Sequence, residues 1–211
     1  MKMNKKTLVI LGHPDLAASR VSAEFVRQLE DYPVTLHEIC KFHEHFRFNV
    51  EREQALLTAH HRIVFLFPLY WYSVPALLKK WLDDVFLPGF AYAREGDKLA
   101  GKEFLVLTTV GAPPEGYRAG GFNRFTLDEL LRPFQQTANY VKAKYLPAIA
   151  IYESVFLDQT TLEAEVRAAC RQIVDDYVDP SQLYEQLLEK AEAQQIALLD
   201  TATQLKDQSS I

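Results

Sequence analysis

The sequence contains only two cysteines, Cys40 and Cys170, and they lie far apart in no metal-binding spacing. Such a pair predicts free thiols in a reducing, intracellular setting. No apolar run approaches the ~20 residues that a membrane-spanning helix needs. The apolar run at 7–11 follows a basic start, but it is too short for a signal peptide and ends at Gly12-His13-Pro14. These absences predict a soluble cytoplasmic protein.

The sequence also lacks an excess of basic residues, since its formal net charge is −5. This charge gives no electrostatic reason to expect nucleic acid as a partner, and no long basic run indicates an anionic membrane. No GxGxxG follows the first predicted strand, which argues against a dinucleotide-binding Rossmann fold. No catalytic triad or metal cluster is visible. These absences leave an α/β protein of another type.

Short β-rich runs alternate with helical patterns along most of the chain, as they do in a parallel sheet built from βαβ units. The runs predict strands at 7–11, 34–39, 62–67, 102–108 and 145–152. Helices are predicted from residue 19, at 51–59, at 75–86, from residue 126 or 128 to about 141, and at 160–178. The pattern predicts a flavodoxin-like fold, a five-stranded parallel sheet in the order 2-1-3-4-5 with helices on both faces.

The end of the chain predicts a separate helical extension. We expect a domain at 1–180 and an amphipathic helix with a polar tail at 181–211, capped by Ser181. The apolar stripe of this helix comprises Leu183, Leu187, Ala191, Leu198 and Leu205. Such a stripe needs a surface to cover. That surface could belong to the same domain, to a second subunit or to another partner.

Function is expected in three loops that leave the carboxyl ends of the predicted strands, at 12–22, 68–75 and 109–125. The first loop leads into a helix whose unpaired amides form a natural phosphate site. Ser19 and Ser22 can add hydroxyl donors there, and His13 or Arg20 can add a charged one. The alternatives are that a serine here only caps the helix and that the hydrogen bonds of His13 are satisfied within its own turn.

The second loop places Tyr70, Trp71 and Tyr72 in succession between Pro68 and Pro75. Strands more often end in small or polar turn residues, whereas consecutive aromatic side chains offer flat faces for a stacked ring system. The alternative is a hydrophobic loop that covers the edge of the sheet. This loop is the strongest sequence signal for a planar ligand.

The third loop is polar and then rich in glycine and proline from Thr109 to Tyr117. Its amides could reach the edge of a planar ligand. Long loops in compact domains are often functional, although the bare pattern shows only a long loop.

At these loops the sequence resembles the flavodoxin-like NAD(P)H:quinone oxidoreductases. The residues at 67–92 read FPLYWYSVPALLKKWLDDVFLPGFAY, a near-complete match to the family's block, and the likeness runs from about residue 7 to 152. EREQALL at 51–57 and the segments at 116–118, 123–125 and 131–134 are most similar to a small bacterial branch. That branch includes ancillary subunits of glutathione-gated potassium efflux systems.

The resemblance implies FMN, or alternatively FAD, as the cofactor, and it implies site residues. The flavin phosphate would be held by His13, Ser19, Arg20, Val21 and Ser22. The isoalloxazine ring would be lined by Pro68, Leu69, Tyr70, Trp71 and Tyr72. Its other edge would meet Thr109, Val110 and Gly111. Tyr117 and Arg124 would act at the N1/O2 region.

Three positions depart from the family's pattern. Val110 stands where many members have glycine, so the backbone there is less free to approach a ligand. Ser22 replaces a common asparagine. Arg124 lies where the animal quinone reductases carry a histidine. A permanently charged arginine could stabilise the anionic reduced flavin or bind a nicotinamide phosphate; a structural ion pair with Glu115 or Asp128 is the alternative.

The activity implied is ping-pong hydride transfer from NAD(P)H through the flavin to a quinone or similar acceptor, in a homodimer that completes the pocket. The alternative is a regulatory subunit that docks on a potassium efflux transporter at the inner face of the membrane, with little or no turnover. A stand-alone soluble reductase with another acceptor is the third hypothesis. The intact aromatic block favours flavin binding, whereas Val110 and the missing histidine favour impaired turnover.

Overall fold

The computed structural model describes the backbone of residues 5–208 and the side chains of residues 5–196. The chain divides into two compact units, and the boundary lies between Asp175 and Asp176. The second contains helix α7 (Pro180–Gln208), on which Leu183 and Leu187 are exposed. The expected stripe positions Leu198 and Leu205 lie outside the described side chains. The domain boundary expected at residue 180 stays a prediction.

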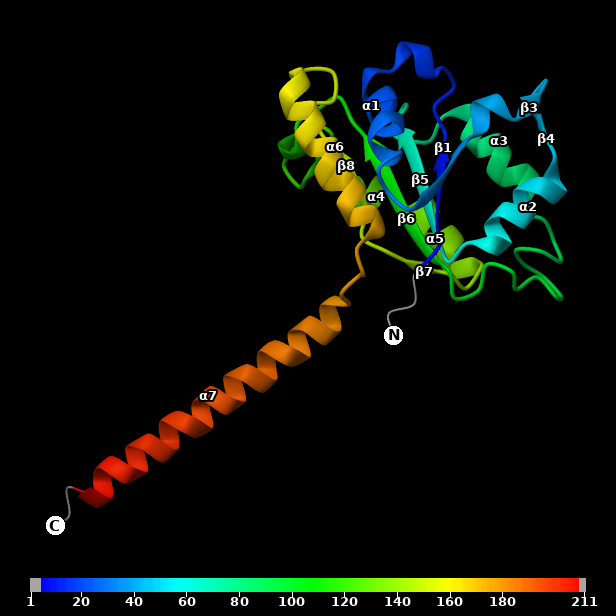
Figure 1. The fold of residues 1–211 in the computed structure, drawn as a ribbon. Coiled ribbons are helices and arrows are strands. Elements are labelled where there is room, and N and C mark those ends of the chain that lie inside the picture. Colours follow the sequence, from blue (N-terminus) through cyan, green and yellow to red (C-terminus); the bar gives the residue numbers. More distant parts are fainter. Residues whose placement is uncertain (1–4, 209–211) are drawn as a thin grey trace. The chain divides into compact units, whose positions relative to one another are not determined.

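The first unit contains a parallel sheet in the order β2-β1-β5-β6-β7, which confirms the predicted order 2-1-3-4-5 (Figure 1). Its strands are β1 (Thr7–Leu11), β2 (Val34–Glu38), β5 (Arg62–Pro68), β6 (Glu103–Thr109), β7 (Lys144–Tyr145) and β8 (Ile149–Ile151). Strand β8 pairs with β6 beyond β7. The continuous fifth strand predicted at 145–152 is therefore wrong. Pro147 stands in the break, where it has no N–H to donate to the ladder.

The helices of the first unit are α1 (Arg20–Leu29), α2 (Val50–Ala59), α3 (Ala76–Val85), α4 (Leu127–Leu130), α5 (Arg132–Tyr140) and α6 (Gln159–Val174). Short 3-10 turns are η1 (Leu16–Ala18), η2 (Ile39–Lys41) and η3 (Pro114–Tyr117), and a small antiparallel hairpin comprises β3 (His43–Glu44) and β4 (Arg47–Phe48). The hairpin was not predicted. Its two-residue strands are too short for a pattern of period two to be visible.

Two predicted helices differ from those observed. The single helix expected from residue 126 or 128 is divided at Leu131, whose ψ is 2°, because Pro133 cannot donate the helical hydrogen bond to Glu129. Helix α6 ends at Val174 rather than at residue 178. The buried guanidinium of Arg62 donates to the carbonyl oxygens of Ile173 (2.5 Å) and Asp175 (2.8 Å), and this fixes the end of α6.

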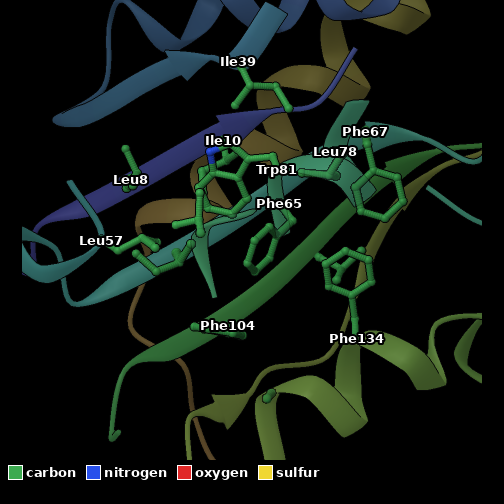
Figure 2. Packing of buried hydrophobic residues seen from close by; sticks show 14 of the residues in the cluster. Leu8, Ile10, Ile39, Leu57, Phe65, Phe67, Leu78, Trp81, Phe104 and Phe134 are labelled. Carbon is green, nitrogen blue, oxygen red and sulfur yellow. The ribbon is translucent and has the colours of Figure 1, made fainter. Parts of the chain in front are cut away.

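The core lies on both faces of the sheet because side chains alternate along each strand. On one face, Phe65 lies against Trp81 of α3, with ring centroids 6.5 Å apart, and Phe67 stacks on Phe134 of α5 at 5.3 Å (Figure 2). On the other side, α1 packs with α6 (Figure 1), and their residues Phe25 and Val166 are fully buried. Helices on both faces are thus confirmed.

Deletion of residues 176–211 is expected to leave the first unit folded. The sheet and every buried hydrophobic residue among the described side chains lie before Asp175, so the free energy of unfolding of residues 1–175 should stay within about 1 kcal/mol of the full chain. Chemical denaturation of both chains measures this. Loss of the cooperative transition in the short chain would show that the extension is part of the folding unit.

Candidate functional site

The three predicted loops lie together where the carboxyl ends of the strands form one edge of the sheet, because their strands are neighbours in it. The amide of Gly12, after β1, donates to Leu66 of β5 at 2.8 Å. The amide of Leu69, after β5, donates to Thr109 of β6 at 2.9 Å. Val110 in turn donates to Ile151 of β8 at 2.9 Å. The candidate residues of all three loops therefore lie along one edge.

His13 connects the first loop to the second. Its side chain is buried, its Nδ1 accepts the amide proton of Asp15 at 3.0 Å, and its Nε2 lies 3.3 Å from the hydroxyl of Tyr70. Burial lowers the pKa of His13 below its ordinary value, although the charge of Asp15 partly opposes this. A neutral imidazole that donates from Nε2 to Tyr70 satisfies both contacts.

Helix α1 begins at Arg20, within the last residues of the first loop. The Ser19 Oγ caps it by accepting the amide proton of Ser22 at 3.1 Å, and the earlier amides of the first turn stay available to an anion. Val21 and Ser22, which belong to this turn, are buried. Arg20 is turned elsewhere, because its guanidinium donates to the carbonyl oxygen of Leu157.

The second loop is a tight turn that holds its aromatic rings away from the core. The amides of Tyr70 and Ser73 each donate to the other's carbonyl oxygen, at 2.9 and 3.0 Å. Trp71 (φ 49°) and Tyr72 (φ 60°) therefore occupy the left-handed region, which is costly for aromatic residues. The Trp71 side chain is 93% exposed, so this loop does not simply cover the sheet with apolar groups. It presents flat faces to the outside.

The third loop presents bare backbone at Gly111. A Cβ atom placed on Gly111 would meet only Val155 Cγ2, at 3.9 Å, so the space beside this backbone is open. Val110 was expected to hinder a ligand. Its side chain is instead buried in the hydrophobic core, so it does not fill the open side.

Tyr117 and Arg124 lie further along this loop. The half-buried Tyr117 ring is 6.1 Å from that of Tyr152, and its burial raises the pKa of Tyr117. Arg124 is exposed with φ 63°. Within residues 5–196 no ion pair joins it to Glu115 or Asp128, so that alternative is not observed.

Asn123 is a candidate that sequence reasoning missed. Its Oδ1 accepts a hydrogen bond from the Tyr72 hydroxyl at 3.1 Å and so joins the second loop to the third. Its Nδ2 is buried, and the described part of the chain gives it no hydrogen-bond partner. No sequence signal marks this residue, because one asparagine in a polar loop is common.

The lowered pKa of His13 predicts a pH dependence of stability. Below the ordinary pKa of 6.5, His13 binds a proton in the unfolded chain but not in the folded chain. Stability is therefore lost as the pH falls through 6.5. The variant His13→Gln should show a smaller loss of unfolding free energy between about pH 7.5 and about pH 5.5. Urea titrations at both pH values measure this. An equal loss in both proteins would contradict the neutral, buried state of His13.

Among the described residues, no helix is both long and apolar enough to cross a membrane. In the same part of the chain, no group of three or more His, Cys, Asp or Glu side chains is arranged to hold a metal ion.

Comparison with known proteins gives the family of the chain. The profile of a family described by its flavodoxin-like fold matches residues 5–175. A Bacillus subtilis protein named as an uncharacterized NAD(P)H oxidoreductase, YrkL, is 44% identical over 81% of this chain and 96% of its own length. The potassium-efflux ancillary protein KefG of Cronobacter sakazakii is 39% identical over 83% of this chain and 96% of its own length.

Solved structures agree with this fold. An NADPH-quinone reductase from P. pentosaceus is 37% identical, with a TM-score of 0.74 over 82% of this chain and 99% of its own. General stress protein 14 of Treponema denticola, solved with FMN, is 35% identical, with a TM-score of 0.73 over 80% and 97% of the two chains.

A third structure carries a different name. A chain from Streptomycin violaceusniger described as a thermophilic tryptophan halogenase is 42% identical, with a TM-score of 0.79 over 81% of this chain and 99% of its own. These findings confirm the resemblance based on residues 67–92. The chain belongs to the flavodoxin-like family, among relatives named as NAD(P)H oxidoreductases, quinone reductases and potassium-efflux ancillary proteins.

Proposed function

We propose that the protein is an FMN-dependent NAD(P)H:quinone oxidoreductase. The observation that carries this proposal is the edge where a helix start, an outward-facing aromatic turn and the bare backbone of Gly111 lie together. Those features suit a phosphate, a planar ring and the edge of that ring, respectively. Relatives named as oxidoreductases and a relative solved with FMN support the same conclusion.

The residues present fit FMN. The first turn of α1 and its cap Ser19 would hold the phosphate. The backbone of this turn is formed by Arg20, Val21 and Ser22. The ring would lie between the turn at 68–72 and the backbone at 109–111, with Tyr117 and Arg124 at its polar edge. When bound, FMN supplies hydride and electron transfer between NAD(P)H and an acceptor. This chain's residues would orient it.

The expected homodimer has a natural surface at this edge. Large apolar side chains lie exposed in the second and third loops and at residues 155 and 156, where Val155 is the neighbour of Gly111; they are Trp71, Phe122, Phe125, Val155 and Phe156. Exposed apolar clusters of this kind mark association sites. A second copy that covers these side chains would also close the open side of the flavin site.

A regulatory role on a potassium efflux transporter is the second candidate function. It is favoured by the 39% identity with KefG, whose name assigns it to such a system. In that case the protein would lie in the cytoplasm at the inner face of the membrane. Binding of flavin would persist, but turnover with free quinones would be low.

The test is to purify the protein, identify any released flavin by mass spectrometry and measure oxidation of NADH and NADPH with a quinone. We expect a yellow protein that releases FMN and turns over with one of the two nicotinamides. A protein that cannot be loaded with FMN or FAD would overturn the proposal. Bound FMN without turnover, together with co-purification of a membrane transporter, would select the regulatory role.

A further inference from the structure

A hollow lies on the β3–β4 hairpin and the start of α2, on residues that contribute nothing to the proposed flavin site. Figure 1 shows where the hairpin and α2 lie in the fold. The volume of the hollow is about 880 Å³, which is within the range of small-molecule sites. The hairpin turns tightly at His45 (φ 49°) and Phe46 (φ 61°). The lining comprises Lys41, Phe42, His43, Glu44, His45, Arg47, Phe48, Asn49 and Arg52.

The lining concentrates positive charge in a chain whose net charge is −5. Among the described residues, neither Arg47 nor Arg52 takes part in an ion pair. Lys41 pairs with Glu38 at 2.8 Å, and Glu44 is the only carboxylate among the described residues of the lining. Unpaired guanidinium groups bind phosphates through two parallel hydrogen bonds. The charge therefore favours an anionic ligand, and the two arginines favour a phosphate.

One of these arginines is also fixed as a flat platform. His37 stacks on Phe42, with ring centroids 4.7 Å apart and an angle of 17° between the planes. The guanidinium of Arg52 lies 4.1 Å from the centre of the same ring. Since His37 occupies one face of Phe42, Arg52 lies over the other. The outer face of a guanidinium held in this way is a stacking surface for an aromatic ring.

The platform rests on a buried network. The Nε2 of His37 is 2.7 Å from Glu53 Oε2, and both side chains are almost fully buried. The position of Phe42, and through it that of Arg52, is therefore set by the core. An exposed arginine fixed in advance loses less conformational freedom when a ligand binds.

We propose that this hollow binds a nucleotide, with its base stacked on Arg52 and its phosphates held by Arg47. An inorganic polyphosphate or an acidic peptide would use the cations but leave the platform empty. The site is separate from the flavin site, and the proposal does not depend on the proposed function.

The test is isothermal titration of the full chain, saturated with FMN, with ADP, pyrophosphate and adenosine. Saturation with FMN prevents ADP from reporting on the start of α1. We expect ADP to bind at least about tenfold more tightly than either partial ligand. Arg47→Glu should weaken ADP binding at least about tenfold, whereas Arg132→Glu, the same charge change at an exposed residue of α5, should not.

A second variant separates stacking from charge. Arg52→Lys keeps the positive charge but removes the planar surface, so it should weaken ADP binding and leave pyrophosphate binding unchanged. Pyrophosphate binding as tight as that of ADP would overturn the nucleotide assignment. Unchanged ADP binding in Arg47→Glu, or its absence in the unmodified protein, would overturn the site itself. Far-ultraviolet circular dichroism of each variant confirms that the comparison is made on folded protein.

Discussion

Glu53→Ala is expected to lower the free energy of unfolding by about 3–5 kcal/mol, because it removes one partner of a buried polar network. The Oε2 atom of Glu53 accepts a hydrogen bond from Trp81 Nε1 at 2.8 Å and faces His37 Nε2 at 2.7 Å. All three residues are at most 3% exposed. Their polar groups would stay buried without the carboxylate, and a cavity would add to the loss. Urea denaturation monitored by tryptophan fluorescence measures the change.

The matched control is Glu51→Ala, two residues earlier in the same helix. Glu51 is exposed in the first turn of α2, where a carboxylate has a small favourable interaction with the helix dipole. Its loss should cost less than about 1 kcal/mol. Similar effects of the two substitutions would show that Glu53 contributes no more than an interaction with the helix dipole and not a buried network.

Gly111→Ala is expected to reduce FMN affinity at least about tenfold while leaving the stability of the flavin-free protein within about 0.5 kcal/mol. An added Cβ would meet no protein atom nearer than 3.9 Å, so the fold accommodates it. The same Cβ would fill the space where the ring edge is proposed to approach the backbone. Fluorescence titration with FMN and thermal unfolding of the flavin-free protein measure the two effects.

Gly121→Ala supplies the contrast within the same loop. Its added Cβ would lie 2.3 Å from the Glu115 carbonyl oxygen and 2.7 Å from that of Gly116, so the backbone must move. We expect a loss of about 1–3 kcal/mol of stability together with weaker FMN binding. If Gly111→Ala binds FMN normally, the ring does not approach the loop at Gly111.

The sequence predicted the sheet well because its buried strands are continuous apolar runs that are long enough to identify. Both boundaries of the strand Thr7–Leu11 were predicted correctly, and the strand order followed from the alternation of strands and helices. The errors lie where tertiary contacts or one proline override the local pattern. Arg62 ends α6 from a distant strand, and Pro147 divides the last strand.

The candidate site shows the same division. Which loops converge was predictable, because the carboxyl ends of neighbouring parallel strands share one edge. How individual side chains are used was not. Nothing in the sequence indicated that Arg20 would turn to the Leu157 carbonyl or that Asn123 would bond to Tyr72. The hollow at the β3–β4 hairpin could not be predicted, because its charged side chains are brought together by a turn of left-handed residues.

The turn at Tyr70–Ser73 has a consequence for how binding free energy is distributed. Two aromatic residues in the left-handed region cost on the order of 1–3 kcal/mol each, and the protein bears that cost when it folds. A flavin that arrives later meets a turn whose backbone is already formed, so it loses less affinity to ordering that turn. Glycine at position 72 would relax the turn and stabilise the flavin-free protein. The turn would then have to become ordered when the flavin binds.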